Sequence, residues 1–355
     1  MSQVTPSAPD PRFLEFVAKS EELKGERLAA AIPRAYFEPS LPRSIASLVM
    51  SAGLYFGPLV LAAVLMNWYV TPVLIILSGL GGWGLHLVAH ECGHGSFSRN
   101  RKLNFVVGHI VSIPLLYPFH SWRHAHNMHH SHTNSLTEDR DWCPISEAVY
   151  RRLPWWRRLG YLSVRTWAVW AGSINYWSTS AFRPSYFPKA EMRRDVRRSI
   201  VFVLLGGSLY LGVVGYLGGW LGLVLFFVAP WFLTHVWFSI TTLMHHSAED
   251  IPFLPAQYWT RNASRLLVTT DYVYSRWLLL LTHYISIHTA HHVAPVIPSH
   301  NLLKAQAALK EAYPGMVREQ PATVSALWRI LKRCRFYDPV SGLYATSVLR
   351  RRRRR

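Results

Sequence analysis

Residues 44–90 read SIASLVMSAGLYFGPLVLAAVLMNWYVTPVLIILSGLGGWGLHLVAH, a run of 47 residues without one Asp, Glu, Lys or Arg. At 1.5 Å per helical residue this run covers roughly 70 Å, about two crossings of a ~30 Å hydrocarbon layer. A second uncharged run of 50 residues extends from Ser199 to Ala248. Each run is interrupted near its middle, at Asn67-Trp68-Tyr69 with Pro72 and at Gly218-Gly219-Trp220. Each run therefore predicts a helical hairpin through a membrane.

We expect an all-α integral membrane protein whose four transmembrane helices form two hairpins under a cytoplasmic helical cap. The expected spans are about 45–66, 72–88, 200–217 and 220–244, and the cap comprises 89–199 and 245–313. Residues 44–313 then form one membrane domain, between an N-terminal cytoplasmic segment, 1–43, and a C-terminal one, 314–355. Three stretches are too short or too polar to span the membrane, and we expect them to lie as interfacial helices or to dip into the interface: 105–119, 161–182 and 277–287.

The charges give the expected orientation. The chain carries 38 Lys and Arg against 19 Asp and Glu, a formal charge of +19. With four spans, every Lys and Arg falls on one side, which the positive-inside rule makes cytoplasmic, together with both termini. A nucleic-acid binder would spread such an excess of base over its fold, so this segregation argues against nucleic acid as a partner. The terminal run from Arg350 to Arg355 either binds anionic headgroups or is a disordered end without a task.

Two further features concern the compartment. The N-terminal MSQVTPSAPDPR lacks the basic and apolar pattern of a signal peptide, so we expect no cleaved leader. Cys92, Cys143 and Cys334 have no paired spacing, which favours a reducing compartment over a disulfide framework. The inner membrane of a bacterium fits these features, and the sequence does not predict an oligomeric state.

The histidines are the candidate functional residues. Many of the 18 gather in clusters that the four spans would bring to one membrane face: HECGH at His90–His94, HSWRHAHNMHHSHTN from His120, His245-His246, and His288-x-x-His291-His292. On a helix, residues i, i+3 and i+4 share a face, so each cluster points two or three imidazoles one way. Eight or nine imidazoles exceed what one metal ion can hold, so two metals are implied, and all-nitrogen ligation favours redox chemistry with dioxygen.

The register of the second cluster stays open, because His126, His129 and His130 compete with alternative spacings from His120, His124 and His132. Five histidines outside the clusters are expected to be hydrogen-bonded or snorkelling residues: His86, His109, His235, His283 and His300.

A competing motif lies inside the first cluster. His90-Glu91-Cys92-Gly93-His94 also fits HExxH, in which two His bind zinc and the Glu is the general base of a metallopeptidase. That interpretation leaves the other clusters without a role. It also needs a third ligand, typically an Asp in another span, and both uncharged runs contain none.

The order HxxxH, HxxHH, HxxHH on two hairpins resembles the membrane fatty acid desaturase superfamily. Longer strings resemble most closely its acyl-lipid Δ12 (omega-6) desaturases of cyanobacteria and plastids, and the similarity runs from about Ser78 to Tyr313. These strings are GHIVSIPLLYPFHSWRHAHNMHHSHTN, TLMHHSAEDIPF and HTAHHVAPVIPSHNLLKAQAAL.

The resemblance implies a non-haem di-iron enzyme that uses dioxygen and two electrons to remove two hydrogens from neighbouring methylenes of an acyl chain. The family's metal ligands carry over onto His90, His94, His126, His129, His130, His288, His291 and His292. A ninth family ligand follows the fourth span, where His245 fits best and His246 is the reserve. Glu91, Asp139 and Asp141 are expected either to orient an imidazole by accepting from its ring N–H or to lie in a solvated loop.

The implied partners are membrane lipid acyl chains and an external electron donor, ferredoxin-like or cytochrome b5-like, since no haem domain, iron–sulfur cysteine set or dinucleotide motif is visible. A basic set would either steer an acidic donor or anchor the cap to anionic lipid: Arg151, Arg152, Arg157, Arg158, Arg193, Arg194, Arg197 and Arg198. The rival functions are a hydroxylase or ketolase of the same superfamily, the zinc peptidase, and a non-catalytic metal-handling membrane protein.

Overall fold

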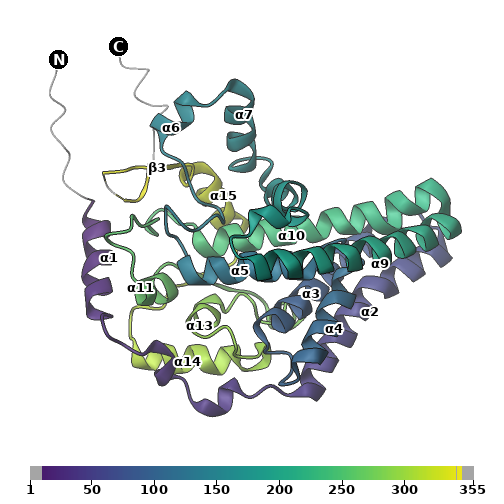
Figure 1. Cartoon of the computed structure of the whole chain (residues 1–355), viewed down its shortest axis with the longest axis horizontal. Coiled ribbons are helices and arrows are strands. Elements are labelled where there is room, and N and C mark those ends of the chain that lie inside the picture. Colours follow the sequence, from purple (N-terminus) through teal and green to yellow (C-terminus); the bar gives the residue numbers. More distant parts are fainter. Residues whose placement is uncertain (1–9, 341, 346–355) are drawn as a thin grey trace.

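The computed structural model describes residues 10–340 and 342–345 of the 355-residue chain. Long helices run side by side at one end of the molecule, and shorter helices form a cap at the other (Figure 1). The long helices are α2 (Leu41–Leu65), α3 (Thr71–His94), α9 (Ala190–Leu223) and α10 (Ala229–His246), with the π-helical η6 (Val224–Val228) leading into α10. The C-terminal arginine run, Arg350 to Arg355, lies outside the described residues.

Three helical stretches of the described chain are long and apolar enough to cross a membrane: Leu41–Leu65, Thr71–His94 and Ala190–His246. Only 22% of the most apolar window of the first is buried and 11% of that of the third, against 78% for α3. Apolar side chains such as Val64 and Leu217 are about three-quarters exposed, at 75% and 78%. Surfaces of this kind are stable in hydrocarbon, so α3 has the burial of a central helix and the other two stretches have the apolar surface expected of helices that face lipid.

The third stretch is not one straight helix. Gly219 has φ 61° and ψ −159°, a conformation that only glycine adopts readily. Beyond it the chain packs back along α9, where Gly222 approaches the carbonyl oxygen of Val214. The reversal lies within Gly218-Gly219-Trp220, the break expected from the sequence. The helices extend beyond the expected spans on the cap side, since α3 continues to His94 and α9 begins at Ala190.

Glycines on α3 allow the close packing of its neighbours. A Cβ atom on Gly81 would overlap the backbone of Leu54 and Tyr55 in α2. A Cβ on Gly82 would overlap Thr234 of α10, whose hydroxyl donates to the carbonyl oxygen of Gly79 at 3.2 Å. Small residues at such crossings let helix backbones approach where no hydrophobic effect drives association.

The three stretches expected at the interface are short helices and turns. The first contains most of α4 (Arg101–Ser112) and ends where α5 (Phe119–His132) begins, and the third contains most of α12 (Arg276–Leu281). The second is not the single helix expected, since it breaks into the end of α7 (Trp155–Val164), η3 (Val169–Ala171), α8 (Gly172–Tyr176) and η4 (Trp177–Ala181). Packing on α10 explains the break, because the backbone N–H and hydroxyl of Ser173 bond to Ser239 Oγ at 2.9 Å.

The remaining elements complete the cap. They are α1 (Pro11–Glu22), η1 (Leu28–Ala31), η2 (Arg34–Phe37), α6 (Glu147–Arg152), η5 (Pro184–Tyr186), α11 (Arg261–Leu266), α13 (His288–Val293), η7 (Ser299–Asn301), α14 (Leu302–Ala312) and α15 (Val324–Arg333). Strand β1 (Asp271–Val273) pairs in parallel with β2 (Glu319–Pro321), and β3 (Phe336–Tyr337) pairs antiparallel with β4 (Tyr344–Ala345). The described part of the C-terminal segment is therefore packed into the cap, where Tyr344 also hydrogen-bonds to Ser247 after α10.

Replacing Gly81 by Ala is expected to lower the free energy of unfolding by about 1–3 kcal/mol, because the new methyl group overpacks the α2–α3 crossing. Gly53→Ala is the matched control, since a Cβ at Gly53 of α2 meets nothing within 4 Å. Thermal unfolding of the detergent-solubilised protein measures both changes. Equal melting temperatures for the two variants would contradict the packing described here.

Candidate metal centre

Histidines from four helices meet where the long helices enter the cap. The last turn of α3 supplies His90 and His94, and α5 supplies His126, His129 and His130. The end of α10 carries His245 and His246, and the short α13 carries His288, His291 and His292. The contact between α3 and α5 and the packing of α11 against both α5 and α13 bring these segments together (Figure 1).

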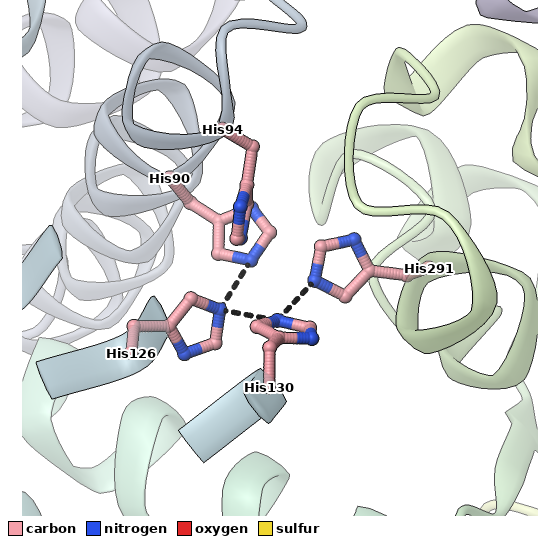
Figure 2. A group of neighbouring side chains, drawn as sticks. All are labelled: His90, His94, His126, His130 and His291. Carbon is pink, nitrogen blue, oxygen red and sulfur yellow. Dashed lines mark hydrogen bonds between the residues drawn. The ribbon is translucent and has the colours of Figure 1, made fainter. Parts of the chain in front are cut away.

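One group contains five imidazoles: His90, His94, His126, His130 and His291 (Figure 2). One nitrogen from each lies within 4.8 Å of the others. His126 Nε2 lies 3.0 Å from Nε2 of His90 and 3.0 Å from Nε2 of His130. His130 Nε2 lies 3.0 Å from Nε2 of His291.

A second group forms around His246. Its Nε2 lies 3.2 Å from Nε2 of His129 and 2.9 Å from Nε2 of His288. His292 Nε2 lies 3.0 Å from Nε2 of His288. His129, His246 and His292 offer nitrogens within 4.8 Å of one another. The ring of His292 lies tilted against that of His130 of the first group, with centroids 4.2 Å apart.

The two HxxHH motifs divide between the groups in opposite ways. From α5, His126 and His130 join the first group and His129 the second; from α13, His288 and His292 join the second and His291 the first. At 3.6 residues per turn, position i+3 falls just short of a full turn and position i+4 passes it, so the two side chains flank residue i on opposite sides of a shared face. The three imidazoles of one motif therefore serve two centres rather than one.

Hydrogen bonding alone cannot satisfy these nitrogens. A ring nitrogen carries either one proton or one lone pair, so Nε2 of His126 cannot serve two neighbours at 3.0 Å. His94 Nε2 is buried and has no hydrogen-bond partner among the described residues. Two imidazole nitrogens bound at right angles to one ion, each at about 2.1 Å, are about 3.0 Å apart. The donor set and its spacing thus fit metal ions in both groups.

Burial keeps most of these rings neutral, which is the form that binds metal. It lowers the pKa values of His126, His130, His288, His291 and His292 well below the ordinary value, and neighbouring histidines lower them further. Burial also disfavours the charged form of His129. There the facing Asp139 carboxylate outweighs burial, and the pKa of His129 is raised.

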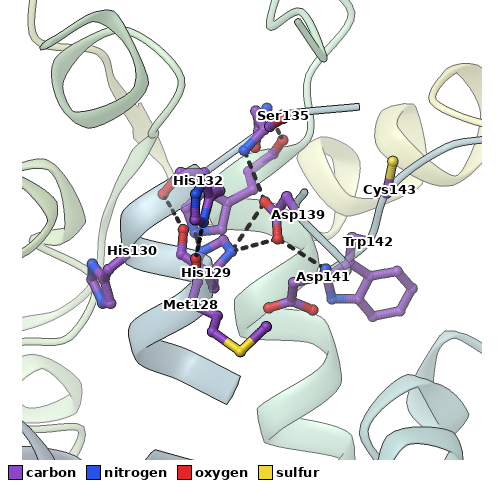
Figure 3. A network of polar contacts seen from close by, with 12 residues as sticks. Met128, His129, His130, His132, Ser135, Asp139, Asp141, Trp142 and Cys143 are labelled. Carbon is purple, nitrogen blue, oxygen red and sulfur yellow. Dashed lines mark hydrogen bonds and ion pairs between the residues drawn. The ribbon is translucent and has the colours of Figure 1, made fainter. Parts of the chain in front are cut away.

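Asp139 is the acid in contact with an imidazole. Its two oxygens lie 3.0 and 3.1 Å from His129 Nδ1, and they also accept the backbone N–H groups of Asn134 and Asp141 at 2.8 and 3.0 Å (Figure 3). A carboxylate that accepts from one ring nitrogen fixes the tautomer and directs the lone pair of the other toward a metal. Asp139 contacts His129 Nδ1 in this way, which leaves the lone pair of His129 on Nε2, the nitrogen that faces the second group.

Asp141 and Glu91 are placed differently. Asp141 bonds to Asp139 through its backbone, and burial raises the pKa of its carboxyl to about 6. Glu91 Oε1 accepts the backbone N–H of Ser299 at 2.7 Å. Among the described residues neither carboxylate accepts a hydrogen bond from an imidazole, so Glu91 ties α3 to the loop after α13 instead of orienting a ring.

Of the two histidines that end α10, it is His246 whose ring nitrogen approaches the second group. Both ring nitrogens of His245 are buried and have no hydrogen-bond partner in the part of the chain that the structure describes. The ring of His245 lies 4.0 Å from that of His288, centroid to centroid. The sequence offered both residues, with His245 as the first choice. Only the rotation of α10 about its axis separates them.

Sequence reasoning missed Asp271, which is 1% exposed and accepts the backbone N–H groups of His288 and Thr289. A signal was available: Asp271 is the only acidic residue between Asp250 and Glu311, in a largely apolar stretch. Burial raises the pKa of its carboxyl to about 7.

A cavity of about 310 Å³ lies beside the imidazoles. Most of its exposed wall is apolar or aromatic, with contributions from Trp83, Leu87, Tyr117, Trp122, Phe238 and Ile285, and polar and charged side chains such as Glu138, Arg140 and Asp141 line the rest. The lining reaches His90, His126, His129, His245 and His288. A largely apolar cavity that ends at a polyhistidine centre suits a ligand with a long hydrocarbon portion.

Fold and site together define a helical protein with stretches long and apolar enough to cross a membrane, and with a two-part histidine cluster that fits metal ions beside a largely apolar cavity. The fatty acid desaturase family model matches residues 45–321. The chain belongs to this family and is an oxidoreductase, a fatty acid desaturase.

Individual relatives agree with the family match. The chain is 34% identical over 352 residues to a Synechocystis protein named sn-1 oleoyl-lipid 12-desaturase, covering 98% of this chain and 97% of that one. It is 33% identical to a second Synechocystis protein, named sn-1 acyl-lipid omega-3 desaturase (ferredoxin), over 93% of each chain. It is 30% identical to the chloroplastic omega-6 fatty acid desaturase of Spinacia oleracea, over 88% of this chain and 69% of that one.

Asp139→Asn is expected to weaken metal binding about 10- to 100-fold, because the amide cannot match the carboxylate that holds the proton on His129 Nδ1. Asp141→Asn is the matched control, since that carboxyl lies near His129 but makes no hydrogen bond to an imidazole in the described part of the chain. Metal content per chain after dialysis against a graded chelator measures both. Loss of metal from Asp141→Asn alone would contradict the role assigned to Asp139.

Proposed function

We propose that this desaturase holds two iron ions and uses dioxygen to insert a cis double bond at the Δ12 position of lipid-linked monounsaturated acyl chains. The observation that carries the proposal is the pair of imidazole groups at the end of an apolar cavity. The printed names of the relatives support the regiochemistry, because the Synechocystis 12-desaturase acts on an oleoyl lipid and covers nearly the whole chain.

Nine histidines would hold the irons. His90, His94, His126, His130 and His291 are proposed for one ion, and His129, His246, His288 and His292 for the other. The proposal takes His246 rather than His245 because its Nε2 lies within 3.2 Å of two other donor nitrogens. The spacing between His126 and its neighbours supports this register of the second cluster over one built on His120, His124 or His132.

An unactivated methylene has no acidic proton, so side chains alone could not remove its hydrogens; the bound irons would supply the oxidising chemistry from dioxygen. In balance, one dioxygen, two electrons, two protons and a CH₂–CH₂ unit give a CH=CH unit and two waters. The chain itself binds and orients the substrate. Apolar residues such as Leu87 and Phe238 would hold the acyl chain and exclude bulk water, and Asp139 would keep the proton of His129 on Nδ1.

Electrons would come from an external donor. One relative is named as a ferredoxin enzyme, and the basic residues of the cap, including exposed Arg194, Arg197 and Arg198, suit an acidic protein of that kind. Asp195 is the acid among them, and it pairs with His124 at 3.4 Å. We therefore propose a ferredoxin-like donor that docks on the cap.

For the topology we propose four crossings: α2, α3, α9 up to Gly219, and the helical chain beyond it through η6 into α10. Both termini, the cap and the irons would then lie on the cytoplasmic side of a bacterial inner membrane, as the distribution of Lys and Arg supports. The proposed domain is residues 44–313, between cytoplasmic segments 1–43 and 314–355.

Expression in a host that contains monounsaturated lipids and a ferredoxin system is expected to produce dienes with the second double bond at Δ12. Gas chromatography of the acyl chains, with mass spectrometry of derivatives to locate the bonds, measures this. Hydroxy acids would indicate a hydroxylase instead. No product from an iron-loaded enzyme with a working donor would reject the proposal.

Replacing His90, His129 or His291 by Ala is expected to abolish diene formation, because each removes one donor to a metal. His132→Ala is the matched control from the same helix as His129: its Nδ1 lies 3.1 Å from the carbonyl oxygen of Met128, outside both groups. Membrane fractionation confirms that each variant is inserted. Full activity in any of the first three variants would show its ligand assignment to be wrong.

A further inference from the structure

The third histidine motif lies on a helix too short to hold its own position. The helix α13 spans only His288–Val293 and has no side-chain cap from its own N-terminal residue, Ile287. Short helices are marginal on their own, and their first N–H groups lack intrahelical partners. Yet this helix must direct imidazoles from His288, His291 and His292 to two separate groups. Something outside α13 must therefore fix its position.

Two distant residues supply the missing acceptors. Asp271 Oδ1, at the start of β1, accepts the N–H of His288 at 2.5 Å and that of Thr289 at 2.7 Å. Gln306 Oε1, on α14, accepts the next N–H, that of Ala290, at 3.1 Å. Gln306 Nε2 in turn donates to Asp271 Oδ2. Three consecutive N–H groups of the first turn are thus satisfied by one joined pair of side chains.

The pair is buried and anchored. Asp271 is 1% exposed and Gln306 3%, so water does not compete for these bonds. The backbone N–H of Asp271 donates to the carbonyl oxygen of Arg318 at 2.9 Å, that of Thr270 to the carbonyl oxygen of His245 at 2.8 Å, and that of Tyr272 to the carbonyl oxygen of Ser286 at 3.1 Å. The strand that carries Asp271 therefore connects the histidine end of α10 to the segment that precedes α13.

We propose that Asp271 and Gln306 are positioning residues for the metal centre, acting as an external cap that sets the orientation of α13 and hence of its three imidazoles. The inference rests on the proposed metal-dependent function. Neither residue needs to touch metal or substrate, because both side chains act through the backbone N–H groups of the helix.

The proposal can be tested by exchanging the hydrogen-bond donor and acceptor groups of Asp271 and Gln306. In Asp271→Asn, the new side-chain amide N–H faces the N–H of Gln306, and two donors oppose each other. Rotating the Gln306 amide removes that conflict, but it turns the Gln306 N–H toward the backbone N–H of Ala290. In Gln306→Glu two carboxylates face each other. The double variant, D271N/Q306E, exchanges the two groups. The amide at position 271 can then donate to the carboxylate at position 306, whose other oxygen accepts from Ala290, so both polarity and charge are restored.

The experiment compares the wild-type chain, the two single variants and the double variant as purified full-length proteins. We expect each single variant to bind iron about tenfold more weakly in chelator competition, and the double variant to return to within about twofold of wild type. Thr323→Ala is the matched control, because Thr323 caps α15, which carries no histidine. It should lower the melting temperature without changing iron affinity.

Two results would overturn the proposal: single variants with wild-type iron affinity, or a double variant as impaired as the single ones. A double variant that fails to fold along with the single variants counts as the second result. Failure of the proposed function gives a different result: the wild-type chain binds metal but forms no dienes. Coupling between Asp271 and Gln306 in metal affinity would then still stand.

Discussion

The structure depends on placing many buried, neutral imidazoles with their nitrogens about 3 Å apart. Such groups cannot satisfy one another by hydrogen bonding, since each nitrogen offers a single proton or lone pair. Metal ions bound to the same nitrogens would resolve this, provided that the surrounding structure already directs the rings toward them. Four helices that are far apart in the sequence must therefore be held in one relative position, and much of the cap serves that end.

The supporting contacts follow from this constraint. Asp139 acts directly on an imidazole of α5, by hydrogen-bonding to His129 Nδ1. Asp271 and Gln306 act on the backbone of α13, by accepting its first N–H groups. On α3, Glu91 holds the loop after α13 by accepting from Ser299. Each acid is buried beside the centre, where an unpaired charge would be costly, and each is matched by N–H donors. The membrane helices add rigidity, because glycines on α3 allow close contact with both α2 and α10.

Much of the fold could be predicted. The uncharged runs identified the long helices, and glycine at position 219 marked the reversal, because both features depend on local composition. The interfacial stretch at 161–182 was less predictable. Its aromatic and basic composition suggested one surface helix, whereas packing of Ser173 against Ser239 breaks it into short pieces. A contact with a residue 66 positions away leaves no trace in local composition.

By itself, the sequence determined the class of protein and the set of candidate ligands, because the spacing of histidines along a helix is a local property and two HxxHH motifs rarely coincide by chance. Only the tertiary structure decided how they divide. It separated His129 from His126 and His130, brought His246 rather than His245 to the second group, and joined Asp271 to α13. Each of these depends on how a helix is rotated about its axis, and that rotation is set by packing against distant segments.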